Sequence, residues 1–234
     1  MTTTVDPKIH DELARLPQDV RMRSGAVFYS GQDAFSKKRP LYILGLNPGG
    51  SPKDQAAETV ERDLTAWSKM ASRSSRYLDE SWQDKAPGTH GMQPRMRHMF
   101  DRLGVDLRET PASNLVFVRS TSEADLVAEK ERLIEMCWPV HQAVLENLHI
   151  QTILCLGGTA GRWVREIVGA SNRVDSFRET NARGWASETH AASDGRCVVT
   201  VTHPGRADWR NPAADPTPLV RAALGRPPAA YRHY

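Results

Sequence analysis

The chain has 234 residues, a length that buries one sizeable core and predicts a single domain with modest extensions. Hydrophobic residues make up 39% and charged residues 25%, as in ordinary folded proteins, and no apolar run is long enough to cross a bilayer. The net charge of +3 does not by itself indicate a nucleic-acid binder, and the N-terminus lacks the pattern of a signal peptide. We therefore expect a cytoplasmic protein with no membrane partner.

Short apolar runs rich in β-branched residues predict four buried strands. The runs are 41–46, 114–119, 152–156 and 197–202. None alternates cleanly between apolar and polar residues, which is typical of a sheet that is covered on both faces.

Helical periodicity appears between these runs. The helical segments are 92–103, 123–148 and 159–168. Gly104 is a plausible stop for the first, and Pro139 predicts a kink or a break in the second. The polar stretch 51–91 is too long for a plain loop and predicts a helix with an ordered surface excursion.

Strands that alternate with helices predict an α/β fold, specifically a three-layer αβα sandwich with a four-stranded, mostly parallel central sheet. The predicted domain spans 40–224, with an N-terminal extension 1–39 that packs on it and a C-terminal tail 225–234. In such sheets ligands bind beyond the carboxyl ends of the strands, which directs attention to the loops that follow them.

The cysteines do not suggest a metal site. Cys137, Cys155 and Cys197 are scattered and odd in number, and we expect buried, reduced thiols. No CxxC pair or Cys/His cluster has metal-ligand spacing, so the sequence predicts neither a metal nor a cofactor.

Charge gathers at the C-terminal end. From His203 onward the net charge is +3, equal to that of the whole chain. The charges are those of Arg206, Arg210, Arg221, Arg226 and Arg232 against Asp208 and Asp215. Such an excess fits either a polyanion-facing surface or a solvated tail.

The first strand-like run ends in a turn of Gly45, Leu46, Asn47, Pro48 and Gly49. Glycine and proline at a strand end turn the chain sharply and let backbone amides approach a ligand. The Asn47 amide both donates and accepts, so it suits the orientation of a water or an amide-bearing substrate. The turn lacks the Lys-Ser/Thr ending of a phosphate loop. A plain strand-to-helix turn with a left-handed Asn47 also explains the bare motif.

A second loop follows the last strand-like run and contains His203, Pro204, Gly205, Arg206, Trp209 and Arg210. A histidine at a strand's carboxyl end can stabilise an anion or move a proton. Arginines interleaved with tryptophan suit phosphate contact and base stacking. An isolated histidine beside a turn also often serves only as a structural hydrogen bonder.

Together the two loops resemble the signature motifs of the uracil-DNA glycosylase superfamily. Residues 45–49 are similar to the first motif in its Asn form, as in the mismatch-specific and single-strand-selective branches. Residues 203–205 resemble the HPS motif, with Gly205 in place of serine. Asn114 opens a run similar to the family strand whose Asn reads the pyrimidine. The resemblance covers residues 40–212 in the family's order.

The resemblance implies a DNA glycosylase of base excision repair, a monomer without a cofactor. It would hydrolyse the N-glycosidic bond of uracil or another deaminated base after extrusion of the nucleotide from the DNA. It further implies two catalytic residues, Asn47 to hold the attacking water and His203 to hydrogen-bond the departing base. The implied base-binding residues are Gly45, Leu46, Pro48, Gly49, His90 and Asn114. The implied DNA-binding residues are Pro204, Gly205, Arg206, Trp209 and Arg210.

Two departures from the family pattern leave the excised base open. The aromatic residue that stacks on the base is missing from its usual place, where Thr89 and His90 stand, so His90 is the candidate and Tyr77 or Trp82 an alternative. Gly205 lacks the serine hydroxyl that the family uses at the DNA backbone.

Two other functions remain open from sequence. A catalytically silent member of the superfamily would bind single-stranded or damaged DNA, or a nucleotide, without base release. An unrelated small-molecule α/β hydrolase would match the two loops by accident, show no preference for DNA and lack a basic rim around its pocket.

Overall fold

The chain forms an α/β fold, which the computed structural model describes for residues 5–225. The strands are β1 (Leu41–Gly45), β2 (Ala112–Asn114), β3 (Thr152–Leu156), β4 (Asn172–Arg178), β5 (Ala186–Ala191) and β6 (Cys197–Val201). The α-helices are α1 (Pro7–Ala14), α2 (Gln18–Arg21), α3 (Val60–Trp67), α4 (Arg76–Asp79), α5 (Gln93–Leu103), α6 (Lys130–Asn147), α7 (Gly158–Val168) and α8 (Thr217–Leu224). Short 3₁₀ helices are η1 (Gln32–Phe35), η2 (Leu107–Glu109), η3 (Glu123–Leu126) and η4 (Pro212–Ala214). The predicted tail, beyond Gly225, lies outside the described residues.

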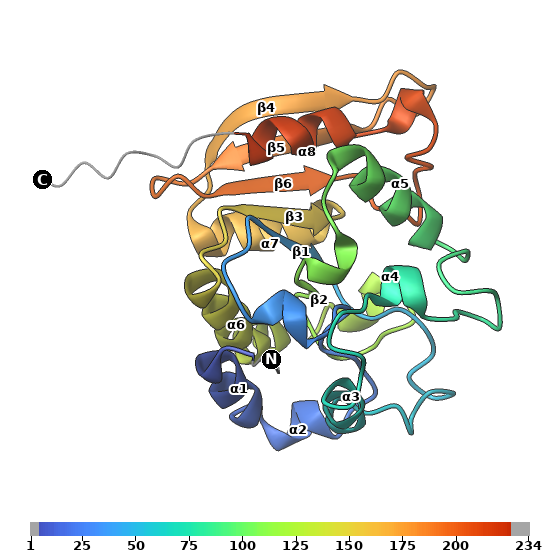
Figure 1. The fold of residues 1–234 in the computed structure, drawn as a ribbon, viewed down its shortest axis with the longest axis vertical. Coiled ribbons are helices and arrows are strands. Elements are labelled where there is room, and N and C mark those ends of the chain that lie inside the picture. Colours follow the sequence, from blue (N-terminus) through green and yellow to red (C-terminus); the bar gives the residue numbers. More distant parts are fainter. Residues whose placement is uncertain (1–4, 226–234) are drawn as a thin grey trace, which may run out of the picture.

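One mixed sheet of six strands, in the order β2-β1-β3-β6-β5-β4, forms the centre of the fold (Figure 1). Strands β2, β1, β3 and β6 run parallel. Strands β5 and β4 extend the sheet in antiparallel fashion beyond β6. The expected α/β class is confirmed, but the prediction of a four-stranded, mostly parallel sheet is wrong, because the sheet is larger and mixed.

β4 and β5 were not predicted because their sequences are polar. β4 lies at the edge of the sheet and exposes Asn172, Arg173, Ser176 and Arg178. Charged side chains on an edge strand hinder its pairing with other chains. Apolar runs reveal strands that are covered on both faces, whereas an edge hairpin needs no such run.

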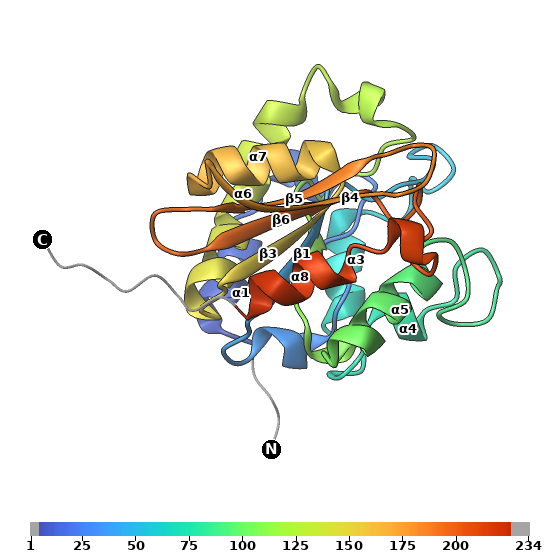
Figure 2. The ribbon, with the colours of Figure 1, turned by 90° about the horizontal axis from the view of Figure 1, so that it is seen from above.

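Helices cover both faces of the sheet (Figure 2). Tyr42 and Leu44 of β1 join the core beneath α1, α6 and α7. Leu41 and Ile43, which point the other way, join the core beneath α5 and α8. β1, β3 and β6 are thus apolar on both faces, which explains the absence of alternation in their sequences.

The predicted helices form with adjusted limits. α5 ends at Gly104, which adopts the left-handed conformation expected of a helix stop (φ 70°). α6 continues through Pro139 without a break, because this proline is exposed and water can satisfy the carbonyl that it leaves unpaired. Within residues 5–225 no helix is long and apolar enough to span a membrane.

The N-terminal segment is built into the core. Ile9 and Phe28 are fully buried in the cluster beneath α6. Residues 24–30 run beside the outer edge of β2, where the Ala26 N–H donates to Phe117 O at 3.0 Å. β2 begins two residues before the predicted strand 114–119 and shares only Asn114 with it. After Asn114 the chain stays beside β1, since the N–H groups of Leu115 and Val116 donate to Gly45 O and Leu46 O, both at 2.9 Å.

A buried histidine joins α6 to the sheet. His141 has no exposed surface, and its Nδ1 lies 2.8 Å from the Tyr42 hydroxyl and its Nε2 3.2 Å from Leu115 O. A carbonyl only accepts, so Nε2 carries the hydrogen and Nδ1 accepts from the hydroxyl. The neutral ring is therefore fully satisfied, and burial lowers the pKa of His141 to about 4.

We expect folding stability to fall by about 2 kcal/mol between pH 7 and pH 5 because of His141. An unfolded histidine titrates near 6.5, so between that value and the folded pKa of about 4 the unfolded chain binds more protons. Stability therefore decreases as the pH falls through this window. Urea unfolding at both pH values measures the change, and His141→Gln should be less stable at pH 7 but less sensitive to pH. A variant with the wild-type pH dependence contradicts this assignment.

Candidate functional site

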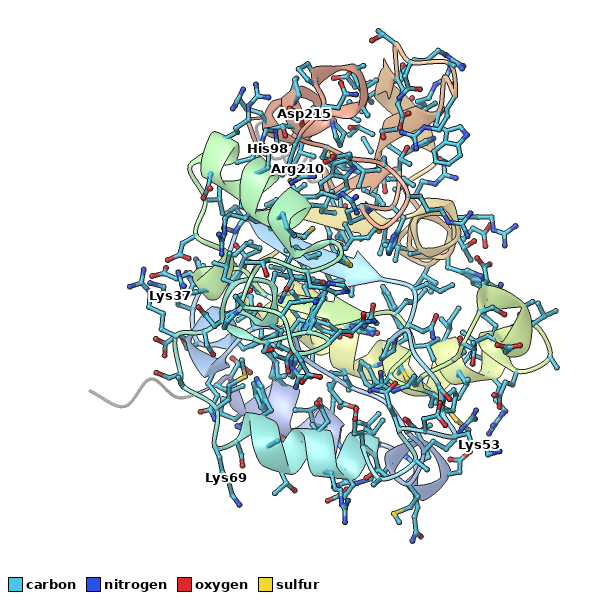
Figure 3. All side chains as sticks on the ribbon, turned by 90° about the vertical axis from the view of Figure 1, so that its right-hand side faces the viewer. Lys37, Lys53, Lys69, His98, Arg210 and Asp215 are labelled. Carbon is cyan, nitrogen blue, oxygen red and sulfur yellow. The ribbon has the colours of Figure 1, made fainter. Side chains whose placement is uncertain are left out.

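The carboxyl ends of the parallel strands meet at one edge of the sheet, on the right in Figure 1 and facing the viewer in Figure 3. Asn114 ends β2, Asn47 follows β1 by two residues, Gly157 follows β3 directly and His203 follows β6 by two residues. Neighbouring strands lie about 4.8 Å apart, so the loops after β1 and β6, separated by β3 alone, begin about 10 Å apart. The sheet thus brings three predicted polar side chains, those of Asn47, Asn114 and His203, to the edge formed by the carboxyl ends of its parallel strands.

The Asn47 amide is held in one orientation. Its Nδ2 donates to Pro48 O and Ser120 Oγ, both at 2.9 Å, and more weakly to Val118 O at 3.4 Å. Carbonyls only accept, so the nitrogen must face them, and Oδ1 remains an acceptor with no donor among the described residues. Among residues 5–225, the non-glycine residues with a positive φ are Gln83, Asp84 and His149. Asn47 is therefore not left-handed, and its amide bonds to the loop and to the residues beside it.

The rest of the first loop divides between core and surface. Leu46 packs against the core beneath α6 and α7, and Pro48 is buried. Gly49 is exposed, and a Cβ at this position would meet no atom within 4 Å. The loop is thus anchored at Leu46 and Pro48 and open at Gly49.

A groove of about 500 Å³ opens beside this loop. Val118 and Ser120, which both accept from Asn47, form part of its wall. Arg119 also lines it and donates to Gly49 O at 2.6 Å, which fixes the groove to the loop. Asn47, Asn114 and His203 do not line this groove, so it lies beside the candidate site and not within it.

The Asn114 side chain is buried against β1. It is 7% exposed and pairs in register with Gly45 of β1. A Cβ at Gly45 would collide with Asn114 Oδ1, so the glycine lets the amide lie against the β1 backbone. Asn114 also lies near enough to Tyr29 to oppose the rise in the pKa of its phenol.

Tyr29 is a site residue that sequence reasoning missed. It is half-buried, and its ring stacks on Tyr77 with a centroid distance of 5.5 Å and an interplanar angle of 20°. The Arg76 guanidinium, paired with Asp63 at 2.6 Å, lies 5.5 Å from the centroid of the Tyr29 ring. Burial raises the pKa of Tyr29, against the opposing charge of Arg76, so the phenol stays protonated. The only signal in the sequence was an aromatic residue in a segment assigned to packing.

The predicted stacking residues lie before α5 and in and after α4. His90 is half-buried in the turn before α5, where its backbone N–H donates to Gln93 Oε1 at 3.1 Å. Tyr77 is 3% exposed, and Trp82 packs edge-on against it at 6.0 Å. A role for His90 in base binding therefore stays a prediction.

His203 is half-buried and presents a defined hydrogen-bond donor. The Gly205 N–H donates to its Nδ1 at 3.0 Å, so the neutral ring carries its hydrogen on Nε2. Burial, and then the charge of Arg206, lower the pKa of His203 and keep the ring neutral at pH 7. The ring lies beside Gly157, the residue that caps the N-terminus of α7. A donor beside a helix N-terminus suits a developing anion.

The glycine at position 205 has a physical reason. A Cβ there would lie 2.9 Å from His203 Nδ1 and 3.1 Å from Cε1, closer than side chains normally approach. The serine of the resembling motif would therefore push the ring away from its bond with the Gly205 N–H. Gly205 therefore lacks the serine hydroxyl but allows a close contact between the His203 ring and the backbone.

The structure corrects one predicted DNA contact. Trp209 has no exposed surface, and its Nε1 donates to Thr202 O at 3.1 Å. A ring without exposed surface cannot stack on a base, so Trp209 holds the loop in place. Arg210 is exposed and forms an ion pair with Asp208 at 2.8 Å. Figure 3 shows Arg210 on the same side of the molecule as His98 and Asp215.

Helix α5 contacts the second loop, residues 203–210, through Arg95. Arg95 donates to Pro204 O at 2.7 Å and lies 3.6 Å from the carboxylate of Asp208. Arg206 is exposed and close enough to lower the pKa of His203. Of the other predicted basic positions, Arg226 and Arg232 lie outside the described residues.

The structure provides no metal centre within residues 5–225, where no group of three or more His, Cys, Asp or Glu side chains is placed to hold an ion. The three cysteines are buried reduced thiols, as predicted. No protein-family model matches the chain, and no curated protein matches it. The superfamily resemblance therefore stays a prediction, and function must be inferred from the geometry of the site.

For the base release that the resemblance implies, we expect Gly45→Ala to lower the rate about 10²-fold, because the new Cβ displaces the Asn114 amide from its place against β1. Single-turnover cleavage of a lesion-bearing oligonucleotide measures the rate, and thermal melting checks the fold. Asn114→Ala should lose a similar amount, and the double variant should lose little more, since both changes remove one interaction. Fully additive losses would show that Gly45 acts independently of Asn114.

Proposed function

We propose that the chain is a DNA glycosylase that hydrolyses the N-glycosidic bond of uracil or another deaminated base. The observation that supports this function is the placement of three complementary groups at one sheet edge. Asn47 offers a fixed free acceptor, Asn114 a buried amide, and His203 a neutral N–H donor. Together they meet the needs of a water nucleophile, a base edge and a departing anion.

The proposed reaction begins with the nucleotide extruded into this edge. The bond between C1′ and the base nitrogen breaks, its electrons stay on the base, and the sugar becomes an oxocarbenium ion. Asn47 Oδ1 orients the water whose oxygen bonds to C1′, and the water's proton passes to solvent. The Nε2–H of His203 donates to the oxyanion of the departing base. Asn114 hydrogen-bonds the base and so orients it.

Exposed arginines favour DNA over a small-molecule substrate. Arg206 lies in the His203 loop, and Arg183, which donates to Arg206 O at 2.6 Å, belongs to the neighbouring β4–β5 connection. A basic rim attracts a polyanion and is not expected of the small-molecule hydrolase. Action as a cytoplasmic monomer accompanies this proposal as a prediction.

The test is base release from a panel of labelled oligonucleotides, single- and double-stranded, with one uracil, hypoxanthine or xanthine each. Alkali converts every abasic site into a strand break, and we expect breaks at one or more of these bases. No breaks across the panel at high protein concentration would overturn the proposal. Binding of the same oligonucleotides without breaks would instead support the catalytically silent alternative.

A further inference from the structure

The connection between β4 and β5, residues 179–185, forms a hairpin tip beside the His203 loop. Its Arg183 donates to Arg206 O at 2.6 Å, and its Thr180 N–H donates to Ala213 O at 2.9 Å. These bonds tie the hairpin tip to residues on both sides of Trp209. The hairpin tip thus adjoins the candidate site, although no residue in it was nominated from sequence.

A buried carboxylate fixes the shape of the hairpin tip. Glu179 is 3% exposed and accepts from Asn181 Nδ2 at 2.8 Å and from Arg183 Nη2 at 3.0 Å. Asn181 Oδ1 accepts in turn from the Arg183 N–H at 2.9 Å. Gly184 adopts the left-handed conformation (φ 57°) that the turn requires. Arg183 is therefore held in one position before any ligand binds.

The hairpin tip presents an aromatic ring to solvent. Trp185 is 40% exposed, and the Arg183 guanidinium lies 4.6 Å from the centroid of its ring. Arg178 and Arg206 are exposed on either side in the chain, one at the end of β4 and one in the His203 loop. A single exposed apolar side chain is ordinary on a protein surface. The arrangement around Trp185 is more specific. Its indole is held by Arg183, and Arg178 and Arg206 and the candidate active site are nearby.

We propose that the hairpin tip binds the DNA strand beside the extruded nucleotide, with Trp185 stacked on an unpaired base. Every base has a π face, so the stacking requires no particular sequence. Arg178, Arg183 and Arg206 supply the positive charge that the phosphates require. The nearby carboxylates include the buried one of Glu179, which pairs with Arg183, and that of Asp208, which pairs with Arg210. This inference deepens the proposed function, on which the choice of DNA rests. It adds a strand-binding surface that lies outside the two loops.

The test measures binding of an undamaged, fluorescein-labelled single-stranded oligonucleotide by anisotropy. We expect Trp185→Ala to weaken binding roughly tenfold, as the loss of one base–aromatic stack does elsewhere. Trp185→Phe should restore part of the affinity. Ile167→Ala is the matched control, since Ile167 is 39% exposed but lies near the C-terminal end of α7. Trp185 is exposed, so its variants should melt like the wild type.

Failure of this inference is distinguishable from failure of the proposed function, because binding to undamaged DNA needs no base release. Equal weakening by Trp185→Ala and Ile167→Ala, or unchanged binding in both, overturns the inference even where base release is observed. Failure of the wild-type protein to bind the oligonucleotide at low salt also overturns it. Selective weakening by Trp185→Ala supports the hairpin tip as a binding surface whether or not the chain cleaves any base in the panel.

Discussion

His203→Ala is expected to lower the single-turnover rate of base release by about 10²- to 10³-fold, the usual effect of removing one donor to a developing oxyanion. The Nδ1 of His203 accepts from the Gly205 N–H, so Nε2 is the ring nitrogen left to donate to the base. The ring is only half-buried and makes one hydrogen bond to the protein through its side chain, so the variant should fold normally. Binding of the uncleaved oligonucleotide should change little by comparison with the rate.

His203→Gln is the matched variant, because its amide N–H can still donate to the base, and it should retain more activity than His203→Ala. The pH profile gives a second check. The pKa of His203 is lowered by burial and by Arg206, so the neutral donor persists to lower pH than in an ordinary histidine, and the rate should be about the same at pH 8 and pH 7. A rate that needs a protonated histidine would rise as the pH falls toward 6.5, and this result would contradict the role assigned to Nε2–H.

Three of the four parallel strands could be predicted because their residues are apolar on both faces, whereas the polar β2 shares only Asn114 with the predicted run 114–119. The runs 41–46, 152–156 and 197–202 became β1, β3 and β6 with limits changed by a residue or less at each end. β4 and β5 could not be found in the same way, since an edge hairpin carries polar residues and owes its place to the turn at 179–185 and to pairing with β6. The number of strands therefore depended on contacts that no local pattern encodes.

The candidate site also contains residues that local sequence indicates and residues that only the tertiary structure brings there. Asn47 and His203 stand in loops directly after buried strands, so local sequence was enough to nominate them. Tyr29 lies near Asn114 because residues 24–30 run beside β2, a tertiary arrangement without a sequence signal. Trp209 shows the opposite error, because a tryptophan in a basic loop has the same local pattern whether its ring points outward or into the core.

Asn47→Ala is expected to lower the rate of base release by about 10²-fold or more, because the attacking water loses the acceptor that orients it. The side chain also donates to Pro48 O and Ser120 Oγ, so the variant loses some stability as well as the acceptor. Measurement well below the melting temperature separates the two effects. The loss should appear in kcat under single-turnover conditions, with little change in the affinity for uncleaved DNA.

Ser120→Ala separates orientation of the Asn47 amide from its chemistry. This change removes one of the acceptors of Nδ2 but leaves Pro48 O at 2.9 Å, so Oδ1 should stay close to its position and the rate should fall only slightly. Asn47→Asp should behave like Asn47→Ala, since a carboxylate places an oxygen against the carbonyls of Pro48 and Val118 and the loop must move to relieve the repulsion. Losses of equal size in Ser120→Ala and Asn47→Ala would show that the hydrogen bonds of the loop matter, and that a free Oδ1 acceptor does not carry the reaction.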